Sequence, residues 1–441
     1  MRRGLILLLL GLSATLPAQQ LPLELTLERA VQLALENSKA HQVSELEVRG
    51  ARFRQLGNLG FLPQVTLSGT KNLKEKLMTI VMPSFTPGGE EQSFNLDFTM
   101  NYEFTLQVVQ PVFTGGKILL GNKNALLDLQ LARERERNSR EETALNARKA
   151  FYNIQVLDEL LKAHREALQL AENSHANIKQ SFDLGMASQY DLLRAELAVR
   201  SARPAITQTE TLRQVSMLGL KQLLGIPEEQ EVRLLGELGF AEVRLELDGL
   251  LDGALTGRSE IRQLDLTRRK VDNLEKLAWA QFLPDFSIVA SYNYRADTFR
   301  LRGRTWENYY TINLGVSLPL FTGLKRSSQV GEAKVARHIA ELNMRQLQDA
   351  TRLEVRSKYL SAQQEYENIL LGQKNVETAR EGVRIAELSY QEGLITVLEL
   401  NSSHNELTRA RVGYLQALYN YNIALAELQK LAGVDLHGGE K

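Results

Sequence analysis

Cysteine is absent from this sequence of 441 residues. Its absence excludes disulfide bonds, thiol catalysis, cysteine-ligated metals and a lipid anchor carried on cysteine. Net charge is absent too, because 53 Lys and Arg residues balance 53 Asp and Glu residues. A balanced chain gives no sign of a nucleic-acid partner or of a strongly acidic substrate, so we expect neither.

Long hydrophobic runs are missing after the N-terminus. An apolar stretch, Leu5–Leu12, follows Arg2 and Arg3, but it is much shorter than the roughly 20 residues that a spanning helix needs. Small residues up to Ala18 complete the pattern of a cleavable signal peptide, predicted over residues 1–18 in preference to a membrane anchor. If the rest of the chain resides in a membrane, it must do so as a closed β-barrel.

Patterns that assemble a catalytic or cofactor site are missing as well. The six histidines show no metal-ligand spacing, and His164 and His175 fall on a helical stripe that favours packing. The segment Val112–Lys117 resembles a phosphate loop, but Pro111 takes the place of its first glycine and Ile118 follows the lysine. We therefore expect no enzyme, no cofactor and no metal, and we interpret these glycines as a strand-to-helix turn.

Equivalent motifs recur along the chain at a constant offset. Three pairs share an offset of 208 (321 minus 113 for the shared Phe): Gln110-Pro-Val-Phe-Thr-Gly115 with Leu318-Pro-Leu-Phe-Thr-Gly323, Phe182-Asp-Leu-Gly185 with Tyr390-Gln-Glu-Gly393, and Leu223-Leu-Gly225 with Leu431-Ala-Gly433. The preceding parts repeat at a slightly larger offset, which is 254 minus 34 for Ala34 with Ala254 and 282 minus 61 for Phe61 with Phe282. A period this long indicates two copies of one module rather than a solenoid.

The repeat divides the chain into predicted domains. The first module is expected over residues 19–225 and the second over 248–433. A connector over 226–247 joins them, and a C-terminal tail covers 434–441. The offset is larger in the early parts of the modules than in the later parts. We therefore expect extra residues in this connector and in the loop before Phe113.

Each module contains segments in which apolar and polar residues alternate. Such alternation predicts strands, here over Phe94–Val108 with a weaker partner over Val65–Thr70, then over Phe286–Tyr294 and Tyr310–Leu318. Two interpretations are open, a half-buried soluble sheet and a membrane barrel with its apolar face outward. The run of about fifteen residues exceeds the usual strand length and favours the barrel.

Long helices follow the strands. The stretch between residues 111 and 204 has no proline, and Lys117–Asp183 carries a helical pattern that would extend about 100 Å. Its apolar stripe alternates spacings of four and three, which is typical of a coiled coil. Lys325–Glu392 repeats the pattern with small residues that would allow close packing, and returning helices are expected over Ser188–Leu224 and Thr396–Leu431. Pro204 predicts a kink in the first returning helix.

These features together resemble one family over roughly Leu23–Gly433. The duplicated strand, strand, long-helix plan, the Pro-x-Phe-Thr-Gly turn and the aromatic-x-x-Gly reversal resemble TolC-like outer-membrane factors. The resemblance implies a mixed α and β membrane protein, a homotrimer whose four strands per chain form a 12-stranded β-barrel. The barrel would continue into a long α-helical coiled-coil tunnel in the periplasm, with the connector in an equatorial region.

The resemblance also implies a function. The chain would be the outer-membrane export duct of a tripartite efflux or type I secretion system, located in the cell outer membrane with a large periplasmic portion. Its implied partners are a periplasmic adaptor protein, an inner-membrane pump and outer-membrane lipid. The alternative is a structural exported coiled-coil envelope protein without channel activity, which would not explain the four alternating strands.

Three sets of residues are candidates for this function. The adaptor-docking tips would be the two helix reversals, Leu184, Gly185, Met186, Ala187 and Ser188 with Gly393, Leu394, Ile395 and Thr396. The barrel lumen would be lined by Asp97, Asn101 and Glu103, and the lipid face by Leu96, Phe98, Met100, Tyr102 and Phe104. Glycine supplies the backbone freedom that each reversal needs.

The third set is a periplasmic gate formed by Asp191, Glu399 and Ile395. Each acid stands six residues after a tip glycine, so three chains would bring six carboxylates to one depth, where crowding should raise some pKa values. The alternative, that both acids only stabilise helix N-termini, stays open. Compared with the family's pattern, Ser402 replaces a second acid and Ile395 a linking Arg, which favours a hydrophobic closure.

Overall fold

The computed structural model describes residues 22–73, 78–82, 92–96, 102–296, 299 and 306–433. The predicted signal peptide, the predicted tail, Asp97 and Asn101 therefore lie outside the described residues. The chain divides into two compact units. Unit 1 contains residues 1–43, 137–258 and 349–441, and unit 2 contains residues 44–136 and 259–348.

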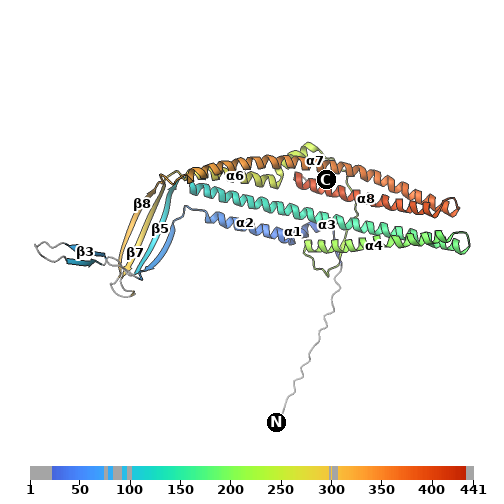
Figure 1. The fold of residues 1–441 in the computed structure, drawn as a ribbon, viewed down its shortest axis with the longest axis horizontal. Coiled ribbons are helices and arrows are strands. Elements are labelled where there is room, and N and C mark those ends of the chain that lie inside the picture. The colour runs from blue at the N-terminus through green and yellow to red at the C-terminus, as the bar shows by residue number, and fades with distance from the viewer. Residues whose placement is uncertain are drawn as a thin grey trace, which may run out of the picture. The chain divides into compact units, whose positions relative to one another are not determined.

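The long helices are confirmed almost residue for residue (Figure 1). They are α3 (Lys117–Asp183), α4 (Gln189–Leu224), α7 (Lys325–Gln391) and α8 (Val397–Ala432). Repeat-related helices have equal lengths, 67 residues for α3 and α7 and 36 for α4 and α8. Helix α4 continues through Pro204, and the kink expected there stays a prediction.

A pair of shorter helices begins each module. They are α1 (Leu27–Asn37) and α2 (Lys39–Gly57) in the first, α5 (Leu247–Gly257) and α6 (Ser259–Ala280) in the second. Single extended residues, Ser38 and Arg258, separate the two helices of each pair. Their amides donate to the carbonyls of Ala34 and Ala254. Ser38 and Arg258 are separated by the same offset as Ala34 and Ala254 (258 minus 38). The break between the two helices therefore recurs at equivalent positions of the two modules.

The connector contributes a short strand that the alternation pattern did not predict. Strand β6 (Val232–Leu234) pairs in parallel with β1 (Leu23–Leu25) at the start of the chain. Leu25 of β1 is fully buried in a core of unit 1 that also contains Phe151, Ile154 and Leu220. Three-residue strands are too short to show alternation, so the sequence carried no usable signal for them.

A four-stranded antiparallel sheet lies in unit 2. Its order is β2-β5-β7-β8, with bounds Gln64–Lys71, Tyr102–Thr114, Asp285–Ala296 and Glu307–Ser317. The four strands are confirmed, but the residues expected to form one strand over Phe94–Val108 belong to two different sheets, and residues 97–101 lie outside the described residues. Strand β4 (Gln92–Leu96) pairs with β3 (Met78–Met82) in a separate two-stranded sheet. The alternating sequence continues across both strands, so periodicity alone could not reveal the division.

The predicted coiled-coil stripes are buried or half-buried within unit 1, except at Phe182, which is exposed. On α3 the stripe residues Ile154, Leu161 and Ile178 are buried, and on α7 Ile369 is fully buried. Close approach of α7 and α8 requires a small residue, because a Cβ on Gly372 would lie 3.2 Å from the ring of Tyr414. The expectation that small residues permit close packing on α7 is therefore confirmed.

One carboxylate joins both repeats within unit 1. Glu427 of α8 lies 2.6 Å from Lys149 of α3 and 2.6 Å from Lys358 of α7. Partial burial alone would raise the pKa of Glu427, but hydrogen bonds from the two lysines and their charges lower it. The carboxylate therefore stays ionised and holds one long helix from each repeat.

Candidate functional site

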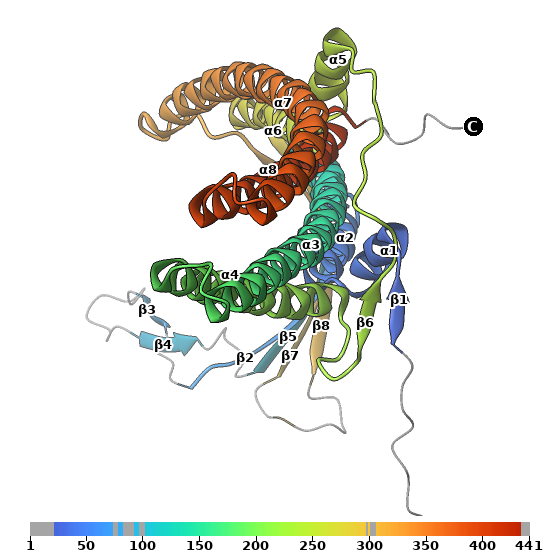
Figure 2. The ribbon, with the colours of Figure 1, turned by 90° about the vertical axis from the view of Figure 1, so that its right-hand side faces the viewer.

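Helix α3 reverses into α4, and α7 into α8 (Figure 2). The two reversals have similar backbone angles. Gly185 has φ 75° and Gly393 has φ 71°, in the left-handed region that favours glycine. The amide of Gly185 donates to Phe182 (2.9 Å), and that of Met186 donates to the carbonyl five residues back (2.8 Å). Gly393 and Leu394 repeat both bonds at 3.0 and 2.8 Å. Both reversals are thus Schellman-type helix ends, as the glycines predicted.

The two acids of the predicted gate belong to capping boxes. The amide of Asp191 donates to the Ser188 hydroxyl (3.2 Å), and the Ser188 amide donates to the Asp191 carboxylate (3.2 Å). Thr396 and Glu399 form the same reciprocal pair at 3.3 and 2.7 Å. Both acids thus take part in the reciprocal hydrogen bonds of a capping box. A ring of charge around an aperture stays a prediction.

The pKa of Glu399 follows from this capping. The backbone amide of Thr396, and then its hydroxyl, donate to the carboxylate and lower the pKa of Glu399. Within one chain the direction is opposite to the increase expected from crowding of like charges. Burial, followed by the charge of Asp191, raises the pKa of Tyr390. Tyr390 belongs to α7 and Asp191 to α4, so this is an electrostatic interaction between the two helix hairpins.

The tips present apolar side chains outward. Leu184, Met186 and Leu394 are exposed, whereas Ile395 is half-buried. Beneath them, Ile178 of α3 packs in one cluster with Val397 of α8, and Ala187 packs against this cluster. The two reversals are therefore held together by an apolar contact, leaving three large side chains available to solvent.

The sheet has one polar face, which the register defines. Thr105 donates to Asn293 across β5 and β7 (2.8 Å), and Glu103 pairs with Arg295 (3.0 Å). The same face carries further polar residues on all four strands, Thr66, Ser68, Thr70, Gln107, Ser291, Thr311 and Asn313. Glu103 is thus the one predicted lumen residue that the structure describes, and it lies on the polar face.

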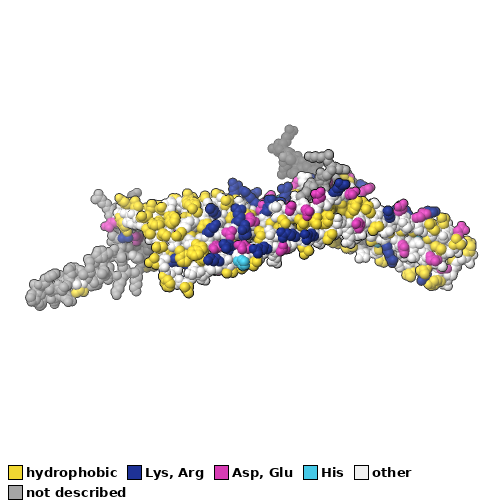
Figure 3. Space-filling view, turned by 90° about the horizontal axis from the view of Figure 1, so that it is seen from above, with side chains coloured by type: hydrophobic (Ala, Val, Ile, Leu, Met, Phe, Trp, Pro, Cys, Tyr) yellow, Lys and Arg dark blue, Asp and Glu magenta, His cyan; other side chains and the backbone are white. Residues whose placement is uncertain are grey.

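The opposite face of the sheet is apolar and exposed. Hydrophobic side chains gather over the end of unit 2 that carries the sheet (Figure 3). The exposed members on this face are Val65, Leu67, Phe104, Leu106, Ile288, Tyr292, Tyr294, Tyr310, Ile312, Leu314 and Val316. Of the predicted lipid face, Tyr102 and Phe104 lie here. Phe98 and Met100 lie outside the described residues, and the Leu96 side chain is not described.

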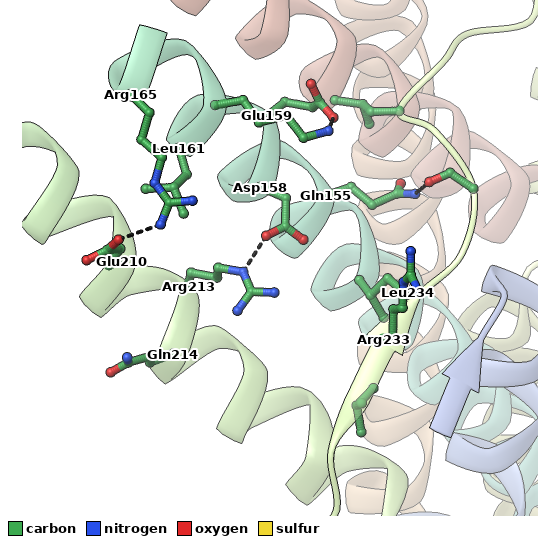
Figure 4. Close-up of a pocket in the computed structure, with 14 residues that line it drawn as sticks. Gln155, Asp158, Glu159, Leu161, Arg165, Glu210, Arg213, Gln214, Arg233 and Leu234 are labelled. Atoms are coloured by element: carbon green, nitrogen blue, oxygen red, sulfur yellow. Dashed lines mark hydrogen bonds and ion pairs between the residues drawn. The ribbon is translucent and has the colours of Figure 1, made fainter. Parts of the chain in front are cut away.

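A cavity of about 580 Å³ lies between α3, α4 and the connector (Figure 4). Its charges are largely paired within the chain, Arg213 with Asp158 and Arg165 with Glu210. The described residues contain no cluster of three or more His, Asp or Glu that could hold a metal. The resemblance of Val112–Lys117 to a phosphate loop is explained by the β5–α3 turn, where Lys117 binds Asp285 at 2.8 Å.

None of the helices in the described part of the chain combines the length and the apolar composition needed to cross a membrane.

A two-faced sheet followed by paired long helices is the fold of TolC-like proteins. The chain is similar to VceC from Vibrio cholerae, with a TM-score of 0.78 and 18% identity over 93% of this chain and 97% of that one. It is also similar to the open MtrE channel of Neisseria gonorrhoeae, with a TM-score of 0.74 and 16% identity over 93% and 89%. At these identities the likeness shows the fold alone, which confirms the predicted TolC-like plan.

The family model described as outer membrane efflux protein matches residues 30–226 and 250–434. The chain therefore belongs to this family of non-enzymatic outer-membrane channels. The predictions of an export channel in the outer membrane, and of no enzyme, are confirmed, whereas a structural envelope protein without a channel is excluded.

Two curated relatives represent different export systems. The chain is 24% identical over 432 residues to the alkaline protease secretion protein AprF of Pseudomonas aeruginosa, covering 91% of this chain and 83% of the relative. It is 21% identical over 388 residues to the probable efflux pump outer membrane protein TtgC of Pseudomonas putida, covering 87% and 78%. The chain is thus a channel of the efflux or type I secretion kind, which operates with other pump components.

Proposed function

We propose that three copies of this chain form one export duct. The observation that carries the proposal is the four-stranded sheet with one polar and one exposed apolar face. Four strands cannot enclose a lumen, since about eight are needed merely to surround side chains. Three chains supply twelve strands, with the polar face around Glu103 turned inward and the apolar face turned toward lipid. Asp97 and Asn101 would extend the lumen lining.

The proposed domains follow the repeat. The first module occupies residues 19–225 and the second 248–433, joined by the connector 226–247. The family model supports this division because it matches two separate segments, 30–226 and 250–434. Residues 1–18 would be removed as a signal peptide, and residues 434–441 would form a tail.

The helix tips are proposed to dock a periplasmic adaptor that is itself joined to an inner-membrane pump. The exposed side chains of Leu184, Met186 and Leu394 support this proposal, because solvent-exposed apolar groups on a rigid reversal suit a partner surface. Gly185, Gly393, Ser188 and Thr396 would act by fixing the reversals, and Ala187 by packing beneath them. Six such tips surround the end of a trimer.

The gate is proposed to lie directly beside the tips. Asp191 and Glu399 begin the returning helices at equal depth, so a trimer would place six carboxylates around the aperture. The half-buried side chain of Ile395 would narrow the aperture in the closed state of the channel. The capping boxes support this arrangement by fixing both carboxylates in position, even though capping alone does not require a channel.

Substitution of the tips tests the proposed docking. Met186→Arg and Leu394→Arg should each abolish export in cells while trimers remain intact, since they add charge to the partner surface without touching the sheet. The readouts are loss of the exported material and loss of chemical cross-links to the adaptor. Leu371→Arg is the matched control, because Leu371 is exposed on α7 far from the tips. Normal export by both tip variants would place docking elsewhere.

A further inference from the structure

A histidine is buried in the α7–α8 hairpin, about three turns of helix from Gly393. His404 is 8% exposed, and neither of its ring nitrogens has a hydrogen-bond partner among the described residues. It lies on one apolar stripe of α8 with three buried residues, Val397, Leu400 and Leu407. A polar group buried without a partner costs free energy. The proposed docking tips and gate do not include this residue.

One carboxylate lies opposite the buried imidazole. A carboxylate oxygen of Glu387 on α7 is 3.6 Å from the Nε2 atom of His404, just beyond hydrogen-bonding distance. The Glu387 side chain is 45% exposed, so its charge stays hydrated while the imidazole does not. Burial lowers the pKa of His404, and Glu387 opposes this effect only in part. The imidazole is therefore neutral at neutral pH and binds a proton only in acid.

Two contacts fix which part of α3 lies beside this part of α8. Arg411 of α8 pairs with Glu166 of α3. Closer to the tips, Val397 of α8 clusters with Ile178 of α3. The two helices are thus antiparallel here, and residues 167–177 of α3 run beside the stripe.

The neighbouring turns of α3, α4 and α7 carry charged and titratable side chains of their own. Three ion pairs lie there, Glu172 with Arg203, Glu196 with Arg200, and Glu381 with Arg384. His175, the other titratable residue of the α3 segment, is half-buried. Among all these groups, the carboxylate of Glu387 is the one that acts on the charge of His404. The response of this site to acid is therefore set by two residues.

The first repeat has different side chains at the equivalent positions. The offset of 208 relates His404 to Glu196 of α4. The same offset relates Glu387 to Lys179 of α3. Lys179 is exposed, and half-buried Glu196 pairs with Arg200 at 2.6 Å. At this position only the second hairpin carries a group that ordinarily titrates between about pH 5 and 8.

We propose that His404 and Glu387 form an acid-sensitive contact that controls the α7–α8 hairpin. At neutral pH the uncharged imidazole packs in the apolar stripe and holds α8 against its neighbours. In acid the imidazole binds a proton, and the new charge must reach water or Glu387, which draws the side chain out of the stripe. The proposal rests on the proposed gate, because this hairpin carries Ile395 and Glu399 at its tip. Acid should widen the aperture through the second hairpin alone.

The sign of the effect follows from the direction of the pKa change. Because the folded protein lowers the pKa of His404, the unfolded chain binds the proton more readily. The stabilisation by the neutral imidazole is fully present above its ordinary value of 6.5 and is lost as the pH falls through the folded-state pKa. This loss begins at a higher pH than the loss of capping by Glu399, so the two effects can be separated.

Hydrogen exchange and conductance of the full-length protein test the proposal together. Both are followed in steps from about pH 7.5 to about pH 5.5. After correction for the intrinsic rate, amides of residues 401–408 should exchange several-fold faster at the lower pH. The gain is at most about tenfold, since that pH lies one unit below the ordinary pKa. Conductance in planar bilayers should rise over the same range, whereas amides of residues 192–200 in the first repeat should not change.

Two variants separate a titrating role from a structural one. His404→Gln keeps a polar side chain but cannot bind the proton, so it should abolish both pH responses. Glu387→Gln removes the charge that favours protonation and should shift both responses toward lower pH. A purely structural role for the histidine would leave the second variant with the wild-type pH profile. Glu387 is partly exposed, so this variant still carries the test if the first one fails to fold.

Two other histidines provide matched controls. His338 lies 3.7 Å from Glu341 in a second histidine–carboxylate pair, but its side chain is 70% exposed. His175 lies in the α3 segment beside the stripe and is half-buried. Neither His338→Gln nor His175→Gln should alter the two pH responses.

Three results would overturn the inference, and they differ from failure of the proposed duct. Exchange of α8 that stays constant in acid, or a response that persists in His404→Gln, would show that this histidine is not the titrating group. Faster exchange without a change in conductance would show that the contact does not control the aperture. A protein that conducts at no pH would instead overturn the proposed duct, while exchange would still report whether His404 titrates.

Discussion

The helix tips and the strand-to-helix turns both occur twice in the chain. The two tips are almost equally exposed, whereas the two turns differ in exposure. At the tips, Met186 and Leu394 are 74% and 76% exposed. At the turns, Phe113 and Phe321 are 46% and 84% exposed. At the tips, where each repeat ends without a following repeat beside it, repeat-related side chains have nearly equal exposure. Where repeats stand side by side, the second copy lacks the neighbour that the first one has. The difference at the turns is the one expected if a second chain covers the edge copy, as in the proposed trimer.

The largest effect is expected when a charge is placed on the apolar face of the sheet. Leu106→Asp and Leu314→Asp are repeat-related and should each abolish trimers in the outer membrane. Although their exposures differ in one chain, both would contact lipid after assembly, where a carboxylate costs on the order of 2 kcal/mol. The amount of trimer in isolated outer membranes is the measurement. Gln107→Asp on the polar face is the control, and equal loss with this control would contradict the assignment of faces.

Substitution of the glycines in the two turns tests whether the turns have different surroundings. Gly115→Ala should destabilise the folded protomer by about 2–4 kcal/mol, since a left-handed residue becomes strained and its Cβ meets Leu283. Gly323→Ala should cost the protomer only about 1–2 kcal/mol, from strain alone. Thermal unfolding of the protomer and dissociation of the trimer are measured separately. Equal effects of both variants on the protomer would remove the distinction between an inner and an edge turn.

The tips should respond to charge without loss of structure. Asp191→Asn together with Glu399→Gln removes both charges but keeps an oxygen that accepts the capping hydrogen bond. In planar bilayers we expect lower cation selectivity and weaker block by multivalent cations added from the periplasmic side. Helix content by circular dichroism serves as the control and should stay constant. Unchanged selectivity would leave the two acids with their capping role only.

The smallest expected effect is a pH dependence at one tip. The pKa of Glu399 lies below its ordinary value of 4.5, because Thr396 donates to the carboxylate. The stabilisation is therefore fully present above that value and is lost as the pH falls through the folded-state pKa. Protection of the amides of residues 397–400 against hydrogen exchange should decrease over this range. Glu399→Gln should remove the change, and a persistent change would assign it to another group.

The long helices could be predicted from the sequence because their ends carry local signals. Gly185 and Gly393 end α3 and α7, while Ser188 and Thr396 begin the returning helices, so each boundary fell within one residue of the structure. These signals act over a single turn of chain and do not depend on tertiary contacts. The reciprocal hydrogen bonds of the capping boxes follow from the same residues.

Strand boundaries were harder to predict, since alternation shows that a residue faces one side but not which strand it pairs with. The pattern around Phe94 belongs to β4, which pairs with β3, rather than to the strand that carries Glu103. The parallel pair β1–β6 depends on contacts between residues far apart in the chain. Exposure at the sheet edges is likewise a tertiary property, so the distinction between Phe113 and Phe321 could not be derived from their shared motif.

Glu427 links the two copies of the duplicated module. Its carboxylate neutralises Lys149 from the first repeat and Lys358 from the second, whereas its repeat-related position (427 minus 208) is Gly219, which has no charge. The bridge therefore exists once in a chain built from two copies. Loss of this one carboxylate would leave an unmatched ammonium group in each half, so a single substitution at Glu427 would be felt by both copies of the module.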